Sequence, residues 1–246
     1  MTLVGFDTSM AVTVACVMPP SGEPVRTPVP PAERLLGPPS HSAELLPALA
    51  GLLERAGRGW EDVTAIAVGV GPGTFTGLRI GVATARALAQ ALSVPLHPVS
   101  SLAALAAGIA APGGAAPGTP VLPLIDAKRG QVFAALHRAG RPGEPEWGPL
   151  ALFPEELEER IRQAPQAPLA AGDWALESIA RLEAVGAVVP APESGVHAID
   201  PLHVCRLARA TPPCPPERVH PVYVRQPDAE IARSARTEAR RGDRPA

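Results

Sequence analysis

The chain has 246 residues, a formal net charge of −2 and only eight aromatic residues, namely three Trp, one Tyr and four Phe. This length allows one large domain or two small ones. The balanced charge argues against a protein whose main role is to bind nucleic acid phosphates, because such proteins carry a strong basic excess or patch.

Three cysteines with no close spacing, Cys16, Cys205 and Cys214, indicate neither a disulfide framework nor a zinc knuckle. The N-terminal residues do not read as a signal peptide, and no long apolar run predicts a membrane span. We therefore expect a cytoplasmic protein with no membrane association.

The first part of the chain predicts alternating strands and helices. Two short apolar runs, 3–6 and 11–17, predict a strand, a tight turn containing Asp7, and a second strand. A helix is expected over 40–57, with a kink at Pro47. A buried strand over 63–70, a Gly-Pro-Gly turn and a long helix over 74–92 follow.

The second part of the chain repeats the opening pattern. After a linker rich in Gly, Pro and Ala over 112–120, a strand is expected over 121–125, followed by Asp126 and a strand over 132–136. Asp7 and Asp126 each close an apolar strand, which is typical of a duplicated domain. The remaining expected elements are helices over 154–161, 174–182 and 200–210, short strands over 169–171 and 187–189, and an extended piece over 221–225.

These patterns divide the chain into three parts. We predict an N-terminal α/β subdomain over 1–111 and a related C-terminal α/β subdomain over 112–225. The charged segment over 226–246 lacks apolar periodicity, so we predict a disordered tail there.

The Gly-rich turn over 71–77 suggests a phosphate cradle, because it links a strand to a helix start. The dinucleotide pattern fails, however, since it requires a third glycine where Thr74 stands. The P-loop pattern also fails, because the turn contains no lysine. A tight structural connection therefore remains the favoured interpretation.

The helix over 74–92 carries two stripes with little polarity. The first stripe consists of Phe75, Leu78, Val82, Ala85, Ala89 and Leu92. The second stripe consists mostly of small residues: Gly77, Gly81, Thr84, Leu88 and Ala91. An ordinary surface helix has one apolar stripe, so this helix is either buried on both sides within the chain or docked to a partner through one of them.

Catalytic and metal-binding patterns are weak. No two of the histidines have the spacing of metal ligands on a helix, and His41 near a helix start fits a capping or packing role. No serine lies in a nucleophile elbow. Asp7 and Asp126 fit two interpretations: they face one cleft and hold a metal-bound nucleotide, or each caps its own hairpin turn.

The stretch from Gly71 to Gly81, with sequence GPGTFTGLRIG, resembles the signature of the TsaB family, also called YeaZ. Further segments match the family in the same order, and together they extend to about residue 225. These segments are 7–9 (DTS), 41–47 (HSAELLP), 99–102 (VSSL), 124–130 (LIDAKRG) and 221–225 (PVYVR).

The resemblance implies an actin-like fold of the sugar-kinase and heat-shock-chaperone type, which is ribonuclease H-like, with two related halves. It also implies a non-catalytic paralogue of TsaD, the subunit that transfers threonylcarbamoyl to the adenosine beside the anticodon of tRNAs reading codons that begin with A. TsaD holds its metal through two histidines, whereas this chain has His41 but Leu45 at the second position.

Partners also follow from the resemblance. The subunit is expected to dock TsaD through a bundle of two helices from each protein, to work with the ATPase TsaE, to form homodimers, and to meet tRNA only through the complex. No cofactor is expected in this chain, since ATP, magnesium and the TsaD metal belong to the complex. The interface residues implied here are His41, Leu45, Leu49, Leu52, Phe75, Leu78, Val82, Ala85 and Ala89.

One departure bears on nucleotide binding. The family often has a Gly-Asp-Gly turn near an adenosine pocket, whereas this chain has Gly172, Asp173 and Trp174. An indole at that position would block the pocket. Asp7, Asp126 and Gly172 are therefore only weak candidates for a nucleotide site. The alternatives are a free-standing actin-like ATPase or kinase, and a glycoprotein peptidase, an older name given to relatives of the fold.

Overall fold

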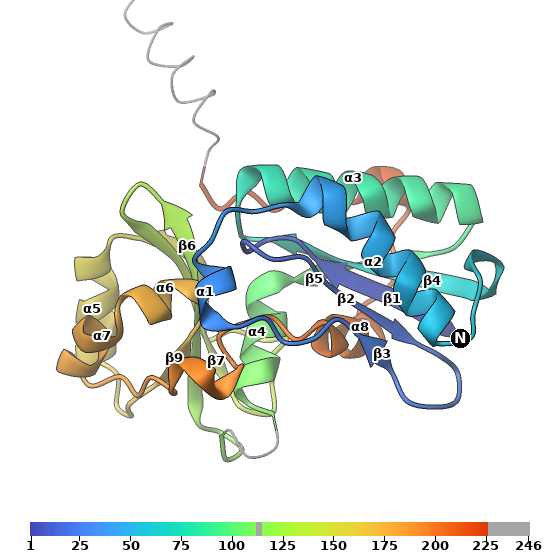
Figure 1. Cartoon of the computed structure of the whole chain (residues 1–246). Helices are drawn as coiled ribbons and strands as arrows, with labels where there is room; N and C mark the ends of the chain where they lie inside the picture. Colours follow the sequence, from blue (N-terminus) through green and yellow to red (C-terminus); the bar gives the residue numbers. More distant parts are fainter. Residues whose placement is uncertain (112–114, 226–246) are drawn as a thin grey trace, which may run out of the picture.

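The first half of the molecule is built on a five-stranded sheet (Figure 1). The computed structural model describes residues 1–111 and 115–225. The strands are β1 (Thr2–Asp7), β2 (Val14–Met18), β3 (Val25–Arg26), β4 (Val63–Gly71) and β5 (Leu96–Ser100), and their order is β3-β2-β1-β4-β5. β1 pairs antiparallel with β2 and parallel with β4, and β5 extends the parallel side.

The second half repeats this topology on a smaller scale. Its strands are β6 (Pro120–Lys128), β7 (Gln131–Arg138), β8 (Trp147–Leu152) and β9 (Leu169–Ala171), in the order β8-β7-β6-β9. β6 pairs antiparallel with β7 and parallel with β9, as β1 does with β2 and β4. The predicted α/β fold with two related halves is therefore confirmed, with Asp7 and Asp126 at equivalent strands.

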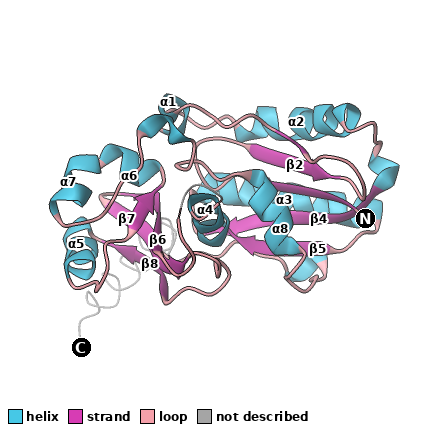
Figure 2. Ribbon diagram, turned by 90° about the horizontal axis from the view of Figure 1, so that it is seen from below, coloured by secondary structure: helices cyan, strands magenta, loops and turns pink. Residues whose placement is uncertain are grey.

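Helices cover both faces of the first sheet (Figures 1 and 2). The alternation of side chains along β1 separates the two layers: Val4 and Phe6 pack with α2 and α3, whereas Leu3 faces the cluster that contains α4 and α8. The helices are α1 (Ala32–Leu35), α2 (His41–Arg55), α3 (Phe75–Leu92), α4 (Ser101–Ile109), α5 (Pro154–Arg162), α6 (Asp173–Glu177), α7 (Ile179–Ala184) and α8 (Pro201–Ala208).

α8 belongs by packing to the first sheet although it follows the second sheet in sequence. It contacts β1, β2, β4 and β5, and Gly5 of β1 makes room for it. A Cβ added at Gly5 would lie 2.5 Å from the Cys205 sulfur. The predicted boundary between the halves stays a prediction, and the chain crosses back to the first half after it has completed the second sheet.

Several elements differ from the sequence expectations. β5, α4 and β8 were not expected, and the single helix predicted over 174–182 is divided into α6 and α7 around Ser178. The strand predicted over 187–189 is reduced to one bridge between Val188 and Leu169. The predicted tail over 226–246 lies outside the described residues. Within 1–111 and 115–225 no helix is both long and apolar enough to span a membrane.

Candidate functional site

Asp7 lies at the end of β1 and is fully engaged by its own half of the molecule. Its Oδ1 accepts hydrogen bonds from the Ser9 N–H (2.7 Å) and the Ser9 hydroxyl (2.5 Å), and its Oδ2 accepts one from the Ser101 hydroxyl (2.6 Å). A Cβ at Gly69 would lie 1.7 Å from Oδ2. The buried carboxylate therefore joins the β1–β2 turn to β4 and to the start of α4.

Asp126, the equivalent residue of the second half, also closes its own turn. Its Oδ1 accepts the Lys128 N–H (2.7 Å), and its Oδ2 pairs with the Lys128 ammonium. This hydrogen bond raises the pKa of Lys128 above its usual value. Lys128, Arg129 and Gly130 all have positive φ, which gives the tight β6–β7 turn its shape.

Gly172 has a packing role that its sequence position did not reveal. Its φ is +136°, and a Cβ there would lie 1.8 Å from the Leu124 carbonyl oxygen of β6. Trp174 is buried in the core of the second half with Leu157 and Leu182. The expectation that this indole blocks a nucleotide pocket is thus corrected, because the side chain points into the core.

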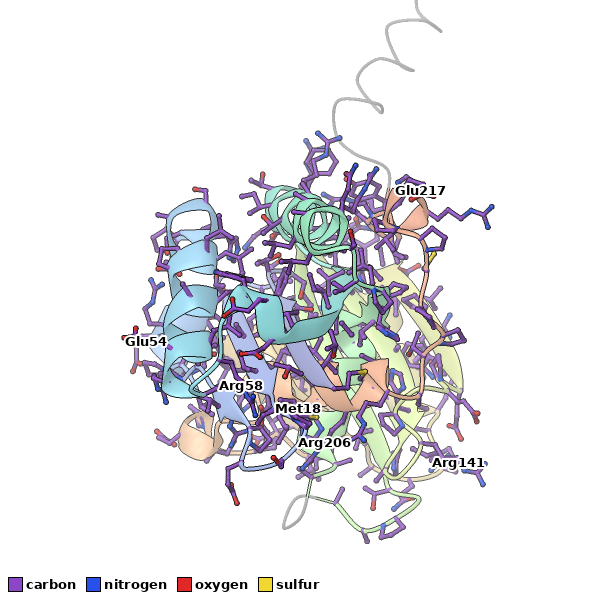
Figure 3. All side chains as sticks on the ribbon, turned by 90° about the vertical axis from the view of Figure 1, so that its right-hand side faces the viewer. Met18, Glu54, Arg58, Arg141, Arg206 and Glu217 are labelled. Atoms are coloured by element: carbon purple, nitrogen blue, oxygen red, sulfur yellow. The ribbon has the colours of Figure 1, made fainter. Side chains whose placement is uncertain are left out.

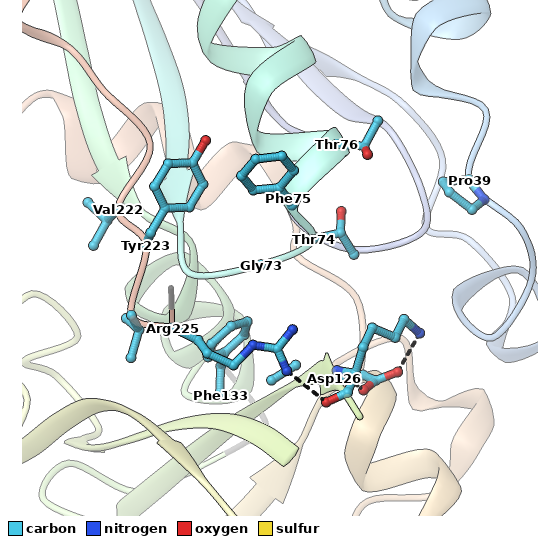
Figure 4. A pocket seen from close by; sticks show the side chains of 13 residues that line it. Pro39, Gly73, Thr74, Phe75, Thr76, Asp126, Phe133, Val222, Tyr223 and Arg225 are labelled. Carbon is cyan, nitrogen blue, oxygen red and sulfur yellow. Dashed lines mark hydrogen bonds and ion pairs between the residues drawn. The ribbon is translucent and has the colours of Figure 1, made fainter. Parts of the chain in front are cut away.

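Between the two halves lies a cavity of about 520 Å³ (Figure 4). It combines aromatic side chains with the start of α3 and the β6–β7 turn. The lining includes Thr74, Phe75, Asp126, Lys128, Phe133, Tyr223 and Arg225. Asp126 lines this cavity, whereas neither Asp7 nor Gly172 does, so the three residues predicted for a nucleotide site do not converge on it.

A C-terminal strap, residues 221–225, runs along the mouth of this cavity. The Val222 N–H donates to the Val70 carbonyl of β4 (2.7 Å), and Arg225 Nη1 donates to the Lys128 carbonyl of the second half (3.2 Å). The strap therefore touches both halves of the molecule.

Phe75, Arg79 and Tyr223 form a cluster at the surface, which we call the cleft-mouth cluster. The Phe75 and Tyr223 ring centroids are 5.2 Å apart, and the Arg79 guanidinium carbon lies 3.8 Å from the Phe75 centroid. Arg79 Nε donates to the Tyr223 hydroxyl (3.1 Å). The sequence gives no sign of this cluster, because 144 residues separate Arg79 from Tyr223 and no local pattern joins them.

The predicted interface residues on α2 and α3 are mostly internal. Eight of the nine are buried: His41, Leu45, Leu49, Leu52, Leu78, Val82, Ala85 and Ala89. Phe75 alone among the nine is exposed, at 37%. The assignment is corrected at this level, since the periodicity marked the side of each helix that packs on the chain's own sheet.

The second stripe of α3 is also used inside the molecule. A Cβ at Gly77 would lie 2.0 Å from the Thr8 carbonyl oxygen, and one at Gly81 would lie 2.2 Å from the Thr8 hydroxyl. These glycines thus let α3 approach the turn after β1. At Gly77 and Gly81 the second stripe therefore packs within the chain and not against a partner.

The solvent side of the two helices is formed by other, mostly small side chains. We call it the outer helix face: Ala43, Leu46, Pro47 and Ala50 of α2, with Thr76, Ile80, Ala83 and Ala87 of α3. Leu46 is 51% exposed. Figure 3 looks roughly along α3, with α2 beside it and Glu54 near the C-terminal end of α2. The two helices thus cover the sheet on one side and present weakly polar surface on the other.

His41 is a buried packing residue. Its Nδ1 lies 2.9 Å from the Thr13 hydroxyl, and its Nε2 has no hydrogen-bond partner. Burial lowers the pKa of His41, so the ring is neutral at physiological pH. Across residues 1–111 and 115–225, no group of three or more His, Cys, Asp and Glu side chains has the geometry to hold a metal ion.

Comparisons with known proteins agree with these features. Residues 38–142 match the family described as TsaD, tRNA N6-adenosine threonylcarbamoyltransferase. The chain is 36% identical over 141 residues to the tRNA threonylcarbamoyladenosine biosynthesis protein TsaB of Escherichia coli, covering 56% of this chain and 57% of that protein. It is 40% identical over 99 residues to TsaB of Bacillus subtilis, covering 40% and 41%. These matches span about half the length of the relatives or less.

Solved structures extend the similarity over nearly the whole fold. A Pseudomonas aeruginosa protein described as similar to peptidase YEAZ has a TM-score of 0.74 and 28% identity, covering 91% of this chain and 99% of that one. YeaZ from Pseudomonas aeruginosa has a TM-score of 0.71 and 26% identity, with 90% and 99% covered. Together with the signature around α3, these similarities support the assignment of the chain to the TsaB proteins, also called YeaZ.

Proposed function

We propose that this chain is the non-catalytic subunit of the machinery that adds threonylcarbamoyl to the adenosine beside the anticodon of tRNAs reading codons that begin with A. Its role is to dock and support a TsaD-like catalytic subunit. The observation that carries this proposal is the outer helix face, where two long helices expose small and apolar side chains.

The relatives support this assignment. TsaB of Escherichia coli is named a tRNA threonylcarbamoyladenosine biosynthesis protein. The segment that matches the TsaD family, 38–142, contains α2, α3 and α4, which is what a paralogue of the catalytic subunit would share with it.

A supporting rather than catalytic role fits the chemistry of the polar residues. Asp7 has both carboxylate oxygens committed to serine donors, and Lys128 holds Asp126. His41 binds Thr13 through one ring nitrogen, and Leu45 stands four residues later, where TsaD-like proteins carry a second histidine. A kinase or ATPase would need a carboxylate open to a metal-bound nucleotide, and Asp7 is not placed for that.

Docking through the outer helix face fits the physics of helix packing. Alanine and threonine side chains allow a partner helix to approach closely, and the exposed Leu46 supplies apolar area at the centre of α2. We propose that one helix pair of the partner packs here to form a four-helix bundle, and that homodimers use the same surface.

We propose that the other components of the complex supply the catalytic groups and the ATP hydrolysis. A TsaE-like ATPase joins the pair, tRNA is met through the complex, and ATP, magnesium and the TsaD metal belong to the partners. We place the assembly in the cytoplasm.

The test is the molar mass, by light scattering on a sizing column, of the chain alone and mixed with the TsaD-like protein of the same organism. We expect a new peak at the summed mass. Ala83→Glu should abolish this peak without changing the melting temperature, because an unpaired charge in a desolvated interface opposes binding by several kcal/mol.

Ala180→Glu is the matched control, since Ala180 is an exposed helical alanine in the second half. It should leave the peak unchanged. Two unshifted peaks for the wild-type mixture, with ATP and the TsaE-like protein also present, would refute the docking role and make nucleotide binding by the isolated chain the next measurement.

A further inference from the structure

Arg79 is held in a fixed orientation at the surface. Its guanidinium stacks on Phe75, with 3.8 Å from its carbon to the ring centroid, and its Nε is bound to the Tyr223 hydroxyl. Stacking and the Nε bond restrict an otherwise flexible side chain, so little further entropy is lost when its remaining donors bind an acceptor. Figure 4 shows Phe75 and Tyr223 next to one another above the cavity.

The terminal nitrogens of this guanidinium have no acidic partner in the part of the chain that the structure describes. No carboxylate in residues 1–111 and 115–225 forms an ion pair with Arg79. Helix α3 contains two arginines and no acidic residue, and its positive N-terminal end begins four residues before Arg79. The helix is therefore electrostatically suited to an anionic partner.

We infer that the cleft-mouth cluster is a receptor for a carboxylate, with Arg79 binding an Asp or Glu side chain of the docked protein in a two-pronged hydrogen bond. Arginine forks match the geometry of a carboxylate, and such pairs are strong when preorganised. The inference rests on the proposed function, since it names the chemistry with which the TsaD-like partner meets α3.

The surroundings favour a protein partner over RNA. The cluster continues into the outer helix face through Thr76 and Ile80, and Val222 and Tyr223 add exposed apolar surface beside it. Two other cations line the cavity: Lys128 is paired with Asp126, and Arg225 donates to the Lys128 carbonyl. Binding to RNA phosphates would need several convergent cations, whereas an arginine set among aromatic side chains is typical of protein interface hot spots.

Three variants test the receptor: Arg79→Lys, which keeps the charge but loses the fork, Tyr223→Phe, which loses only the hydroxyl that orients Arg79, and the control Arg86→Lys on the same helix. The dissociation constant for the TsaD-like partner is measured by calorimetry. We expect Arg79→Lys to raise it by about 30-fold or more, as for an interface hot spot, Tyr223→Phe to raise it less, and Arg86→Lys to leave it nearly unchanged.

A double-mutant cycle then locates the carboxylate. Arg79→Met is combined with Asp→Asn and Glu→Gln changes of the partner, and one acidic position should show strong coupling with Arg79. If the wild-type pair does not associate, the proposed function fails. If it associates and Arg79→Lys binds equally well, the receptor alone is refuted; it is also refuted if Arg79→Lys weakens only tRNA binding by the assembled complex.

Discussion

Asp173 is the residue whose ionisation is most affected by the fold. Its Oδ1 accepts the N–H groups of Asp126 (2.9 Å) and Trp174 (2.8 Å). Burial raises its pKa to about 7 from an ordinary value of 3.8, and the nearby Asp126 charge acts in the same direction. The two N–H donors oppose this rise because they favour the carboxylate.

This shift predicts that acid stabilises the protein over part of its pH range. The folded state holds the Asp173 proton more tightly than the unfolded chain does. The protonated carboxyl therefore adds to the free energy of unfolding in full below about pH 4, and this stabilisation is lost as the pH rises through about 7. The free energy of unfolding should therefore fall by at most about 3 kcal/mol between about pH 5 and about pH 8.

Asp173→Asn should lack this component, since the amide keeps an acceptor oxygen but does not titrate. Urea unfolding of both proteins at the two pH values measures the difference in slope. Equal slopes would show that Asp173 is ionised throughout this pH range in the folded state.

At the residue scale the sequence predicted turns better than it predicted contacts. The hairpin-capping interpretation of Asp7 and Asp126 agrees with their hydrogen bonds to Ser9 and Lys128, which lie two residues away. The third donor to Asp7 comes from Ser101, which is 94 residues distant. No local pattern contains such a contact, just as none joins Tyr223 to Arg79.

Among the elements, α2 shows most clearly which side of a helix supports the fold. Leu49 is completely buried, whereas Leu46 is half exposed on the opposite side. Leu49→Ala should lower the free energy of unfolding by about 2–5 kcal/mol, as for a large-to-small change in a core. Leu46→Ala, the same change on the outer helix face, should have a small effect on stability and weaken docking instead.

Denaturant unfolding and partner binding measured on both variants separate the two sides. A large loss of stability in Leu46→Ala, or a stable Leu49→Ala that fails to dock, would reverse this assignment. The same geometry implies that a charged side chain in place of Val82 or Ala85 unfolds the chain, because both residues lie on the buried side of α3 that packs on the sheet.

Helical periodicity explains both the success and the error at this scale. It located α2 and α3 to within a residue or two, because their apolar residues recur on one face. It could not show whether that face meets the chain's own sheet or a partner. α4 was missed for a different reason: nearly all of its residues are small or apolar and buried, so it has no polar face to mark a helical period.

For the whole molecule, the duplication was visible in sequence and the connection between the halves was not. Two strands that end in Asp predicted the repeated topology, which the matching strand orders confirm. The return of α8 to the first sheet and the course of the strap depend on contacts such as that of Gly5 with Cys205, which are 200 residues apart. Long-range packing of this kind leaves no periodic signal in a single chain.

The strap should hold the two halves together through few bonds, so single changes in it should be informative. Val222→Pro removes the N–H that donates to the Val70 carbonyl, and Val222→Ala keeps it. Because Arg225 of the same strap binds the β6–β7 turn, loss of the first anchor should loosen both attachments. We expect Val222→Pro to increase hydrogen exchange at the start of α3 and at residues 128–131, and to lower the free energy of unfolding by about 1–3 kcal/mol.

Val222→Ala should leave exchange at residues 128–131 near the wild-type level. Unchanged exchange in Val222→Pro would show that the cavity between the halves is held by the packing of α4 and α8 alone.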